Sequence, residues 1–168
     1  RVKDGHAISI EGKELAAYAM AGILTDHEST EYKYAMMKVR NGMYVHIREG
    51  SAARNLEAIV RGIVDNNTDV SRFTFCTDDK HIEDIQREGH ISHNVRKAIR
   101  LGLDPLAAYK MATLNPAQCY GLDHLGMIGV GKKANLIILN DMETVDIDRV
   151  MYGGRFIDQI YDGNKGKV

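Results

Sequence analysis

The chain has 168 residues and a formal net charge of −1, and its basic residues are scattered along the sequence. This balance argues against a nucleic-acid-binding or membrane-surface protein. No apolar run approaches the roughly 18 residues of a membrane span, and no signal peptide is present, so we expect a soluble, cytoplasmic protein. Cys76 and Cys119 are too few and too far apart for a zinc knuckle or a disulfide framework, which fits a reducing compartment.

Short apolar runs alternate with one-sided helical patterns over residues 1–125. The predicted strands cover 23–25, 43–47 and 73–76, with another ending before His6; the predicted helices cover 13–21, the stretch from a Ser29-Thr30 cap to an Asn41-Gly42 stop, 52–66 and 93–101. Asp104 before Pro105 and Asn115 before Pro116 predict two further helix starts, and Gly121 predicts a stop. This alternation predicts an α/β fold with a parallel sheet.

The remaining segment, 126–168, has a different character. It is rich in glycine, and residues 136–139 and 150–152 have strand-like sequences with no helix between them. We therefore expect two units, a β/α unit over 1–125 and a piece of a small β domain over 126–168.

Four polar segments recur along the β/α part, each directly after a predicted strand. They are Asp4-Gly5-His6, Thr25-Asp26-His27-Glu28, Arg48-Glu49-Gly50-Ser51 and Cys76-Thr77-Asp78-Asp79. The steps from His6 to His27, from His27 to Glu49 and from Glu49 to Asp78 are 21, 22 and 29 residues, each about one strand, one helix and two loops. Because a parallel β/α array brings the carboxyl ends of its strands to one rim, we expect the four segments to converge.

His6 and His27 are the predicted metal ligands. Imidazole is the commonest side-chain ligand for divalent transition metals, and strand ends hold it rigidly. The alternative is a pair of buried histidines that hydrogen-bond to the backbone. The equivalent positions of the two residues, one β/α unit apart, favour metal binding.

Three carboxylates follow the same strand ends. Asp78 can bind a metal and take a proton from the water that the metal activates. Glu28, directly after His27, is placed for proton transfer between water and leaving group. Alternatively, Asp78 and Asp79 cap a turn, and Glu28 lies at the surface near a helix N-terminus, where acids are favoured.

Arg48, Glu49 and Ser51 surround a glycine that lets the backbone approach a ligand closely. Arg48 and Glu49 can bind a polar, planar ligand, or they can pair with each other. With Asp79, these residues form the predicted substrate-binding set.

The polar segments belong to longer motifs. These include Asp4-Gly5-His6-Ala7, Ile47-Arg48-Glu49-Gly50-Ser51-Ala52, Phe75-Cys76-Thr77-Asp78-Asp79, Met111-Ala112-Thr113-Leu114-Asn115-Pro116-Ala117 and Gly131-Lys132-Lys133-Ala134-Asn135-Leu136. Together they resemble the bacterial adenine deaminases of the amidohydrolase superfamily, over nearly the whole chain. Ile8 stands where relatives often carry proline.

The resemblance implies the C-terminal half of a TIM-type (β/α)8 barrel, strands five to eight, followed by the start of a small β-sandwich. His6, His27 and Asp78 match metal ligands of a binuclear centre that holds Mn²⁺ or Fe²⁺, with Zn²⁺ as a further option. The implied reaction is hydrolysis of adenine, or a related 6-aminopurine, to hypoxanthine and ammonia, with Asp78 accepting a proton from water. A homo-oligomer is expected.

The first-strand His-x-His pair and the bridging carboxylate of the family have no counterpart here, so we expect a fragment whose active site is incomplete. Two alternatives stay open. One is another amidohydrolase that acts on a cyclic amide or amidine, since the superfamily shares these ligands. The other is a non-catalytic half-barrel that serves as an interaction module, in which His6, His27 and Asp78 are structural.

Overall fold

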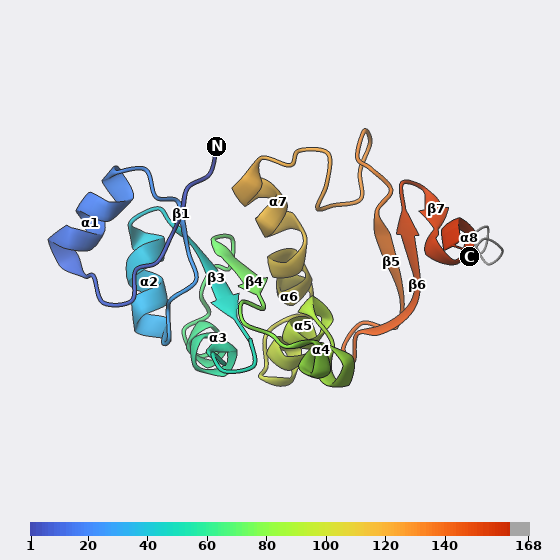
Figure 1. The fold of residues 1–168 in the computed structure, drawn as a ribbon, viewed down its shortest axis with the longest axis horizontal. Helices are drawn as coiled ribbons and strands as arrows, with labels where there is room; N and C mark the ends of the chain where they lie inside the picture. The colour runs from blue at the N-terminus through green and yellow to red at the C-terminus, as the bar shows by residue number, and fades with distance from the viewer. Residues whose placement is uncertain (162–168) are drawn as a thin grey trace.

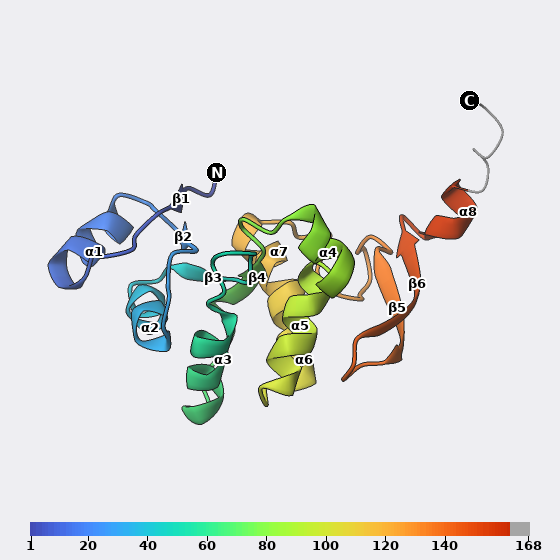
Figure 2. The same ribbon diagram turned by 60° about the horizontal axis from the view of Figure 1, so that its bottom comes forward.

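A computed structural model describes residues 1–161 and contains two sheets of different kinds. Four parallel strands lie in chain order: β1 (Asp4–Gly5), β2 (Thr25–Asp26), β3 (Tyr44–Arg48) and β4 (Phe73–Cys76). Three antiparallel strands follow: β5 (Leu136–Asp141), β6 (Asp146–Tyr152) and β7 (Arg155–Phe156). Helices separate the two sheets in both ribbon views (Figure 1 and Figure 2). The α/β class predicted from the sequence is confirmed.

One helix connects each pair of neighbouring parallel strands, and four more follow β4. The connecting helices are α1 (Gly12–Met20), α2 (Tyr32–Arg40) and α3 (Leu56–Asp65); the later ones are α4 (Ile82–Glu88), α5 (Ile91–Arg100), α6 (Pro105–Ala112) and α7 (Leu114–Tyr120). A last helix, α8 (Ile157–Tyr161), follows β7. None of the helices in residues 1–161 has the length and apolar character needed to cross a membrane.

The main core lies on one face of the parallel sheet. Val45 and Ile47 of β3 are fully buried there against α3, whose Ile59 and Ile63 belong to the same cluster. Each such side chain contributes about 1.5–3 kcal/mol through burial. Because side chains alternate along a strand, Arg48 emerges at the end of β3 on the opposite face.

The opposite face of the sheet carries a polar group. The buried His46 ring contacts Thr74 Oγ1 through Nδ1, and its Nε2 lies 3.0 Å from the Tyr120 hydroxyl, which ties α7 to the sheet. Burial lowers the pKa of His46. Burial also raises the pKa of Cys76 to about 12, so its thiol stays neutral near pH 7.

Two predicted helix caps are wrong. The Ser29 side chain does not cap α2, because its hydroxyl accepts a hydrogen bond from Lys38 and the N-cap position falls on Glu31. Asn115 lies inside α7, where its amide donates to the Val70 and Phe73 carbonyl oxygens.

Other helix signals are confirmed. Asp104 caps α6 by accepting from the Ala107 amide, and Gly121 ends α7 with a left-handed φ of 65°. The predicted helix 52–66 begins later, at Leu56, because Arg54 forms an isolated antiparallel bridge with Glu49.

The antiparallel sheet is less buried than the parallel one. Ile137 and Ile138 of β5 and Ile147 of β6 are exposed. The β5–β6 pairing has register shifts near Leu139, so the hairpin is irregular. The boundary expected after residue 125 falls in the connection between α7 and β5, and residues 162–168 of the expected second unit lie outside the described residues.

Candidate metal centre

The ends of β1 and β2 bring two histidines together. The parallel register places Gly5 beside Asp26, so the residues that follow each strand leave the sheet as neighbours. The His6 and His27 rings meet edge to face with centroids 4.5 Å apart. The predicted convergence of these two residues is therefore present in the structure.

A carboxylate joins the pair. One ligand atom from each of Asp4, His6 and His27 lies within 4.8 Å of the others. Two imidazoles and a carboxylate are donors that suit a divalent transition metal, and the His6 side chain is 70% exposed, so an ion can reach the group. This donor set fits the metal that the sequence implies.

Asp4 has no role among the residues predicted from the sequence. Its Oδ1 accepts a 2.6 Å hydrogen bond from the Thr25 hydroxyl, and its Oδ2 lies 3.7 Å from His27 Nδ1. At this distance Asp4 is a charged neighbour of the His27 ring rather than a hydrogen-bond partner. The only available signal was the position of Asp4 at a strand end, beside His6.

Glu28 lies between the histidines and Arg48. Its Oε1 is 3.1 Å from His6 Nδ1 and 3.6 Å from His27 Nε2, and its Oε2 is 3.0 Å from Arg48 Nη1. Burial raises the pKa of Glu28, but the hydrogen bond with His6 and the nearby charges, Arg48 foremost, outweigh burial and give a net lowered pKa. Glu28 is thus held as a carboxylate next to the group formed by Asp4, His6 and His27.

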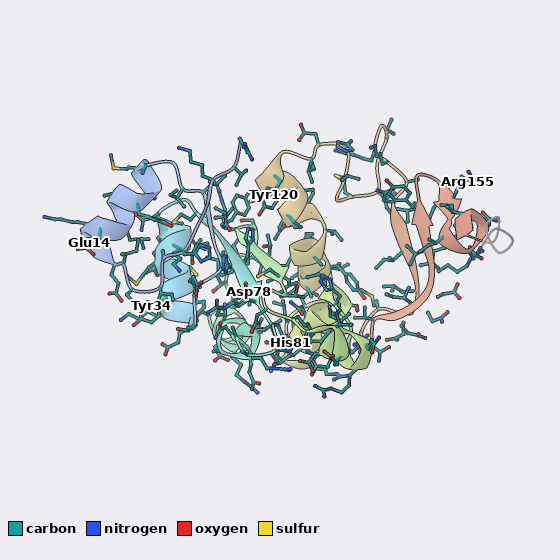
Figure 3. All side chains as sticks on the ribbon, in the orientation of Figure 1. Glu14, Tyr34, Asp78, His81, Tyr120 and Arg155 are labelled. Atoms are coloured by element: carbon teal, nitrogen blue, oxygen red, sulfur yellow. The ribbon has the colours of Figure 1, made fainter. Side chains whose placement is uncertain are left out.

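Arg48 connects Glu28 to Asp78. Its Nη1 donates to Asp78 Oδ2 at 3.3 Å, and its Nε donates to Asn55 Oδ1 at 2.8 Å. Asp78 lies beside the ends of β3 and β4 (Figure 3) and has a left-handed φ of 51°, which is unusual for a residue other than glycine. Within residues 1–161, Asp78 is not part of the group formed by Asp4, His6 and His27.

Glu49, a predicted substrate contact, is held inside the protein. Its side chain is fully buried, with Oε1 2.7 Å from Lys97 Nζ and Oε2 accepting from the Leu56 amide at 3.3 Å. Glu49 therefore joins the end of β3 to the start of α3 and to the last turn of α5. The prediction that it contacts substrate is not supported by this position.

Ser51 and Asp79 brace the loop around Gly50. Ser51 donates to Asp84 of α4, and Asp79 Oδ2 accepts from the Ala52 amide at 3.0 Å, a bond that lowers the pKa of Asp79. A Cβ on Gly50 would lie 1.7 Å from Asp79 Oδ1 and 2.8 Å from a backbone oxygen, so only glycine fits.

Ion pairs around Glu88 anchor α4 next to this loop. Glu88 accepts from Lys80 at 3.0 Å and from Arg54 at 3.2 Å. The Lys80 hydrogen bond leads the causes that lower the pKa of Glu88 to about 2. The loop that follows β3 is consequently held by α4 as well as by its own residues.

Comparisons with known proteins show the family and the fold. The model of the Amidohydrolase family matches residues 3–157, so the chain belongs to that family. Among solved structures, the β-aspartyl dipeptidase of Fervidobacterium islandicum AW-1 superimposes with a TM-score of 0.68 at 16% identity, covering 90% of this chain and 46% of that one. Phenylurea hydrolase B superimposes with a TM-score of 0.62 at 20% identity, and the match covers 91% of this chain and 43% of that one. At these identities the likeness concerns the fold alone.

More similar sequences narrow the resemblance. An adenine deaminase of Desulfitobacterium hafniense is 58% identical over 95% of this chain and 28% of its own length. An adenine deaminase of Clostridium acetobutylicum is 43% identical over 94% of this chain and 27% of its own length. The resemblance to adenine deaminases predicted from the motifs is confirmed, and the chain spans just over a quarter of these relatives.

Proposed function

We propose that this chain supplies part of the active site of an adenine deaminase, which hydrolyses adenine to hypoxanthine and ammonia. The observation that carries the proposal is the convergence of Asp4, His6, His27 and Glu28 at one sheet edge. The 58% identity to a protein named adenine deaminase supports the choice of substrate. Four parallel strands in chain order support the assignment of strands five to eight of a TIM-type barrel, and the β5–β7 sheet supports the start of a small β domain.

The metal-binding residues in this proposal are His6, His27 and Asp78, with Asp4 beside His27. Mn²⁺ or Fe²⁺ is the proposed ion, with Zn²⁺ as the further option, in a centre that is binuclear in the complete enzyme. A divalent ion bound there supplies Lewis-acid activation of water near neutral pH. The carboxylate of Asp78 comes from another strand end and reaches the group through Arg48 and Glu28.

Two carboxylates move the protons. Addition of water forms a bond from oxygen to C6 of adenine, and cleavage of the bond from C6 to the exocyclic nitrogen releases ammonia. Asp78 accepts one proton from the attacking water and passes it to N1 of the ring. Glu28, a carboxylate at rest, takes up the second proton of that water and passes it to the departing nitrogen. Arg48 donates to both carboxylates, so it orients them within one hydrogen-bonded chain.

Arg48 is also the proposed substrate contact on this side of the site. Its guanidinium is planar and lies at the end of β3 with one edge fixed by Asn55. A rigid donor edge suits the ring nitrogens of a purine, which accept hydrogen bonds in a plane. Ser51 and Asp79 hold the loop around Gly50. In this proposal, they line the substrate-binding site on the side of that loop.

The proposal is tested in a chimera, in which this chain replaces the matching stretch of the Desulfitobacterium hafniense relative. We expect metal binding and conversion of adenine to hypoxanthine, with cyclic amides and amidines as comparison substrates. Turnover of a cyclic amide in preference to adenine would contradict the assigned substrate. A folded chimera that binds no metal and has no hydrolase activity would contradict the catalytic proposal and favour a non-catalytic module.

A further inference from the structure

A fully buried carboxylate lies beneath the two histidine loops. Asp26 is the last residue of β2 and directly precedes His27. Its Oδ2 accepts from the Ala7 amide at 2.6 Å, and its Oδ1 accepts from the Glu28 amide at 2.9 Å. One oxygen therefore holds the loop after β1 and the other holds the loop after β2.

A buried lysine neutralises this carboxylate. Lys38 of α2 has a side chain that is 3% exposed, and its Nζ donates to Asp26 Oδ1 and, at 3.0 Å, to the Ser29 hydroxyl. Removing two charges from water is costly, and their mutual attraction often fails to offset that cost. A gain in stability is therefore a weak explanation for the buried pair of Asp26 and Lys38.

We propose that Asp26 and Lys38 form a positioning pair, which sets the relative placement of the His6 and His27 loops for metal binding. This inference depends on the metal site proposed above. Lys38 holds the Asp26 side chain from α2, and the two oxygens of Asp26 offer one acceptor to each loop. Neither residue belongs to the metal-binding group of Asp4, His6 and His27.

A double variant can separate the positioning role of the pair from its charge balance. A carboxylate has two acceptor oxygens, whereas the amide of asparagine has one oxygen and one NH₂ donor. In an Asp26→Asn, Lys38→Met double variant no unpaired charge is buried. One of the two backbone amides then faces a donor and loses its partner.

The experiment uses the chimera and compares Asp26→Asn, Lys38→Met, their double variant and Arg40→Met. Arg40 is an exposed cation at the end of the same helix, so its substitution is the matched control. Three quantities are measured on each protein. They are the melting temperature without metal, the affinity for Co²⁺ from its visible absorption, and hydrogen exchange at the Ala7 and Glu28 amides.

We expect each single variant to melt at a lower temperature, because it leaves one buried charge uncompensated. The double variant should regain most of the lost melting temperature, yet bind Co²⁺ about 10- to 100-fold more weakly than the wild-type chimera. One of its two loop amides should exchange faster. Arg40→Met should match the wild type in all three measurements.

Two results would overturn the inference in distinguishable ways. If the double variant regains both melting temperature and Co²⁺ affinity, the pair has only a charge-balancing role and the proposed function stands. If the wild-type chimera binds no Co²⁺ and deaminates nothing, the metal site fails and the positioning role fails with it.

Discussion

The two halves of the sheet edge differ in what holds their loops. After β1 and β2, a buried residue, Asp26, binds the loop backbones and leaves His6 and His27 available. After β3 and β4, the polar residues of the loops do the holding themselves. Glu49 is bound to Lys97, and Asp79 is bound to the Ala52 amide.

In this molecule, the strand-end residues that stay available for chemistry are those whose loops other residues hold. Arg48 and Asp78 satisfy this condition in the second half, because Ser51, Asp79 and α4 brace the loops around them. Substitution of a residue that takes part in the reaction should therefore lower turnover. Substitution of a residue that holds a loop should instead lower the free energy of unfolding.

The largest effect is expected from removing chemistry. In the chimera, Asp78→Asn should lower kcat for adenine by about 10²- to 10⁴-fold, because the amide cannot accept a proton from water. The measurement is steady-state turnover, with unchanged melting temperature as the sign of an intact fold. His27→Ala should lower Co²⁺ affinity in addition to turnover. Retention of more than a tenth of wild-type kcat in Asp78→Asn would remove Asp78 from the mechanism.

Breaking the brace at Glu49 should act on stability instead. Glu49→Gln replaces a buried, charged acceptor of Lys97, and we expect the free energy of unfolding to fall by about 1.5–3 kcal/mol. Denaturant unfolding gives this quantity, and the KM for adenine should stay within a few-fold. Arg100→Met, an exposed substitution on the same helix as Lys97, is the control. A large rise in KM at unchanged stability would restore Glu49 to the substrate site.

A methyl group at Gly50 should strain the same loop. Its Cβ position lies 1.7 Å from Asp79 Oδ1, so Gly50→Ala displaces Asp79 and should cost about 1–3 kcal/mol in the free energy of unfolding. Gly129→Ala is the matched control, because the nearest atom to its Cβ position is 3.5 Å away on Lys132. Equal stability of the two variants in denaturant unfolding would show that the loop after β3 yields easily.

Spacing predicted that His6 and His27 lie close together, but it did not predict what each residue of the four segments contacts. His6 and His27 were found because each ends a β/α unit of similar length, and the parallel register makes such positions neighbours. Asp26 lies in one of the polar segments and Lys38 in the helix that follows it, yet their pairing depends on how α2 packs on the sheet, which no local pattern specifies. The contact between Glu49 and Lys97 was not predicted for the same reason, because the two residues are 48 positions apart.

The bounds of one strand were predicted from the sequence, whereas the start of one helix was not. The strand Phe73–Cys76 was predicted with its observed bounds, because apolar and β-branched residues are flanked by polar ones. Asn115 before Pro116 has the sequence of a helix start, but tertiary contacts decide otherwise. Its amide binds the Val70 and Phe73 carbonyl oxygens, so the helix begins at Leu114.

The smallest expected effect concerns the ion pairs that anchor α4. Glu88 has a pKa lowered from 4.5 to about 2, first of all by the Lys80 hydrogen bond, so its contribution is fully present above about pH 4.5. As the pH falls from 4.5 toward 2, the unfolded state takes up the proton first and this contribution is lost. Glu88→Gln should therefore melt below the wild-type chimera at pH 7, and the difference should shrink at pH 3. A difference in melting temperature that stays constant between these two pH values would mean that the Glu88 charge does not anchor α4.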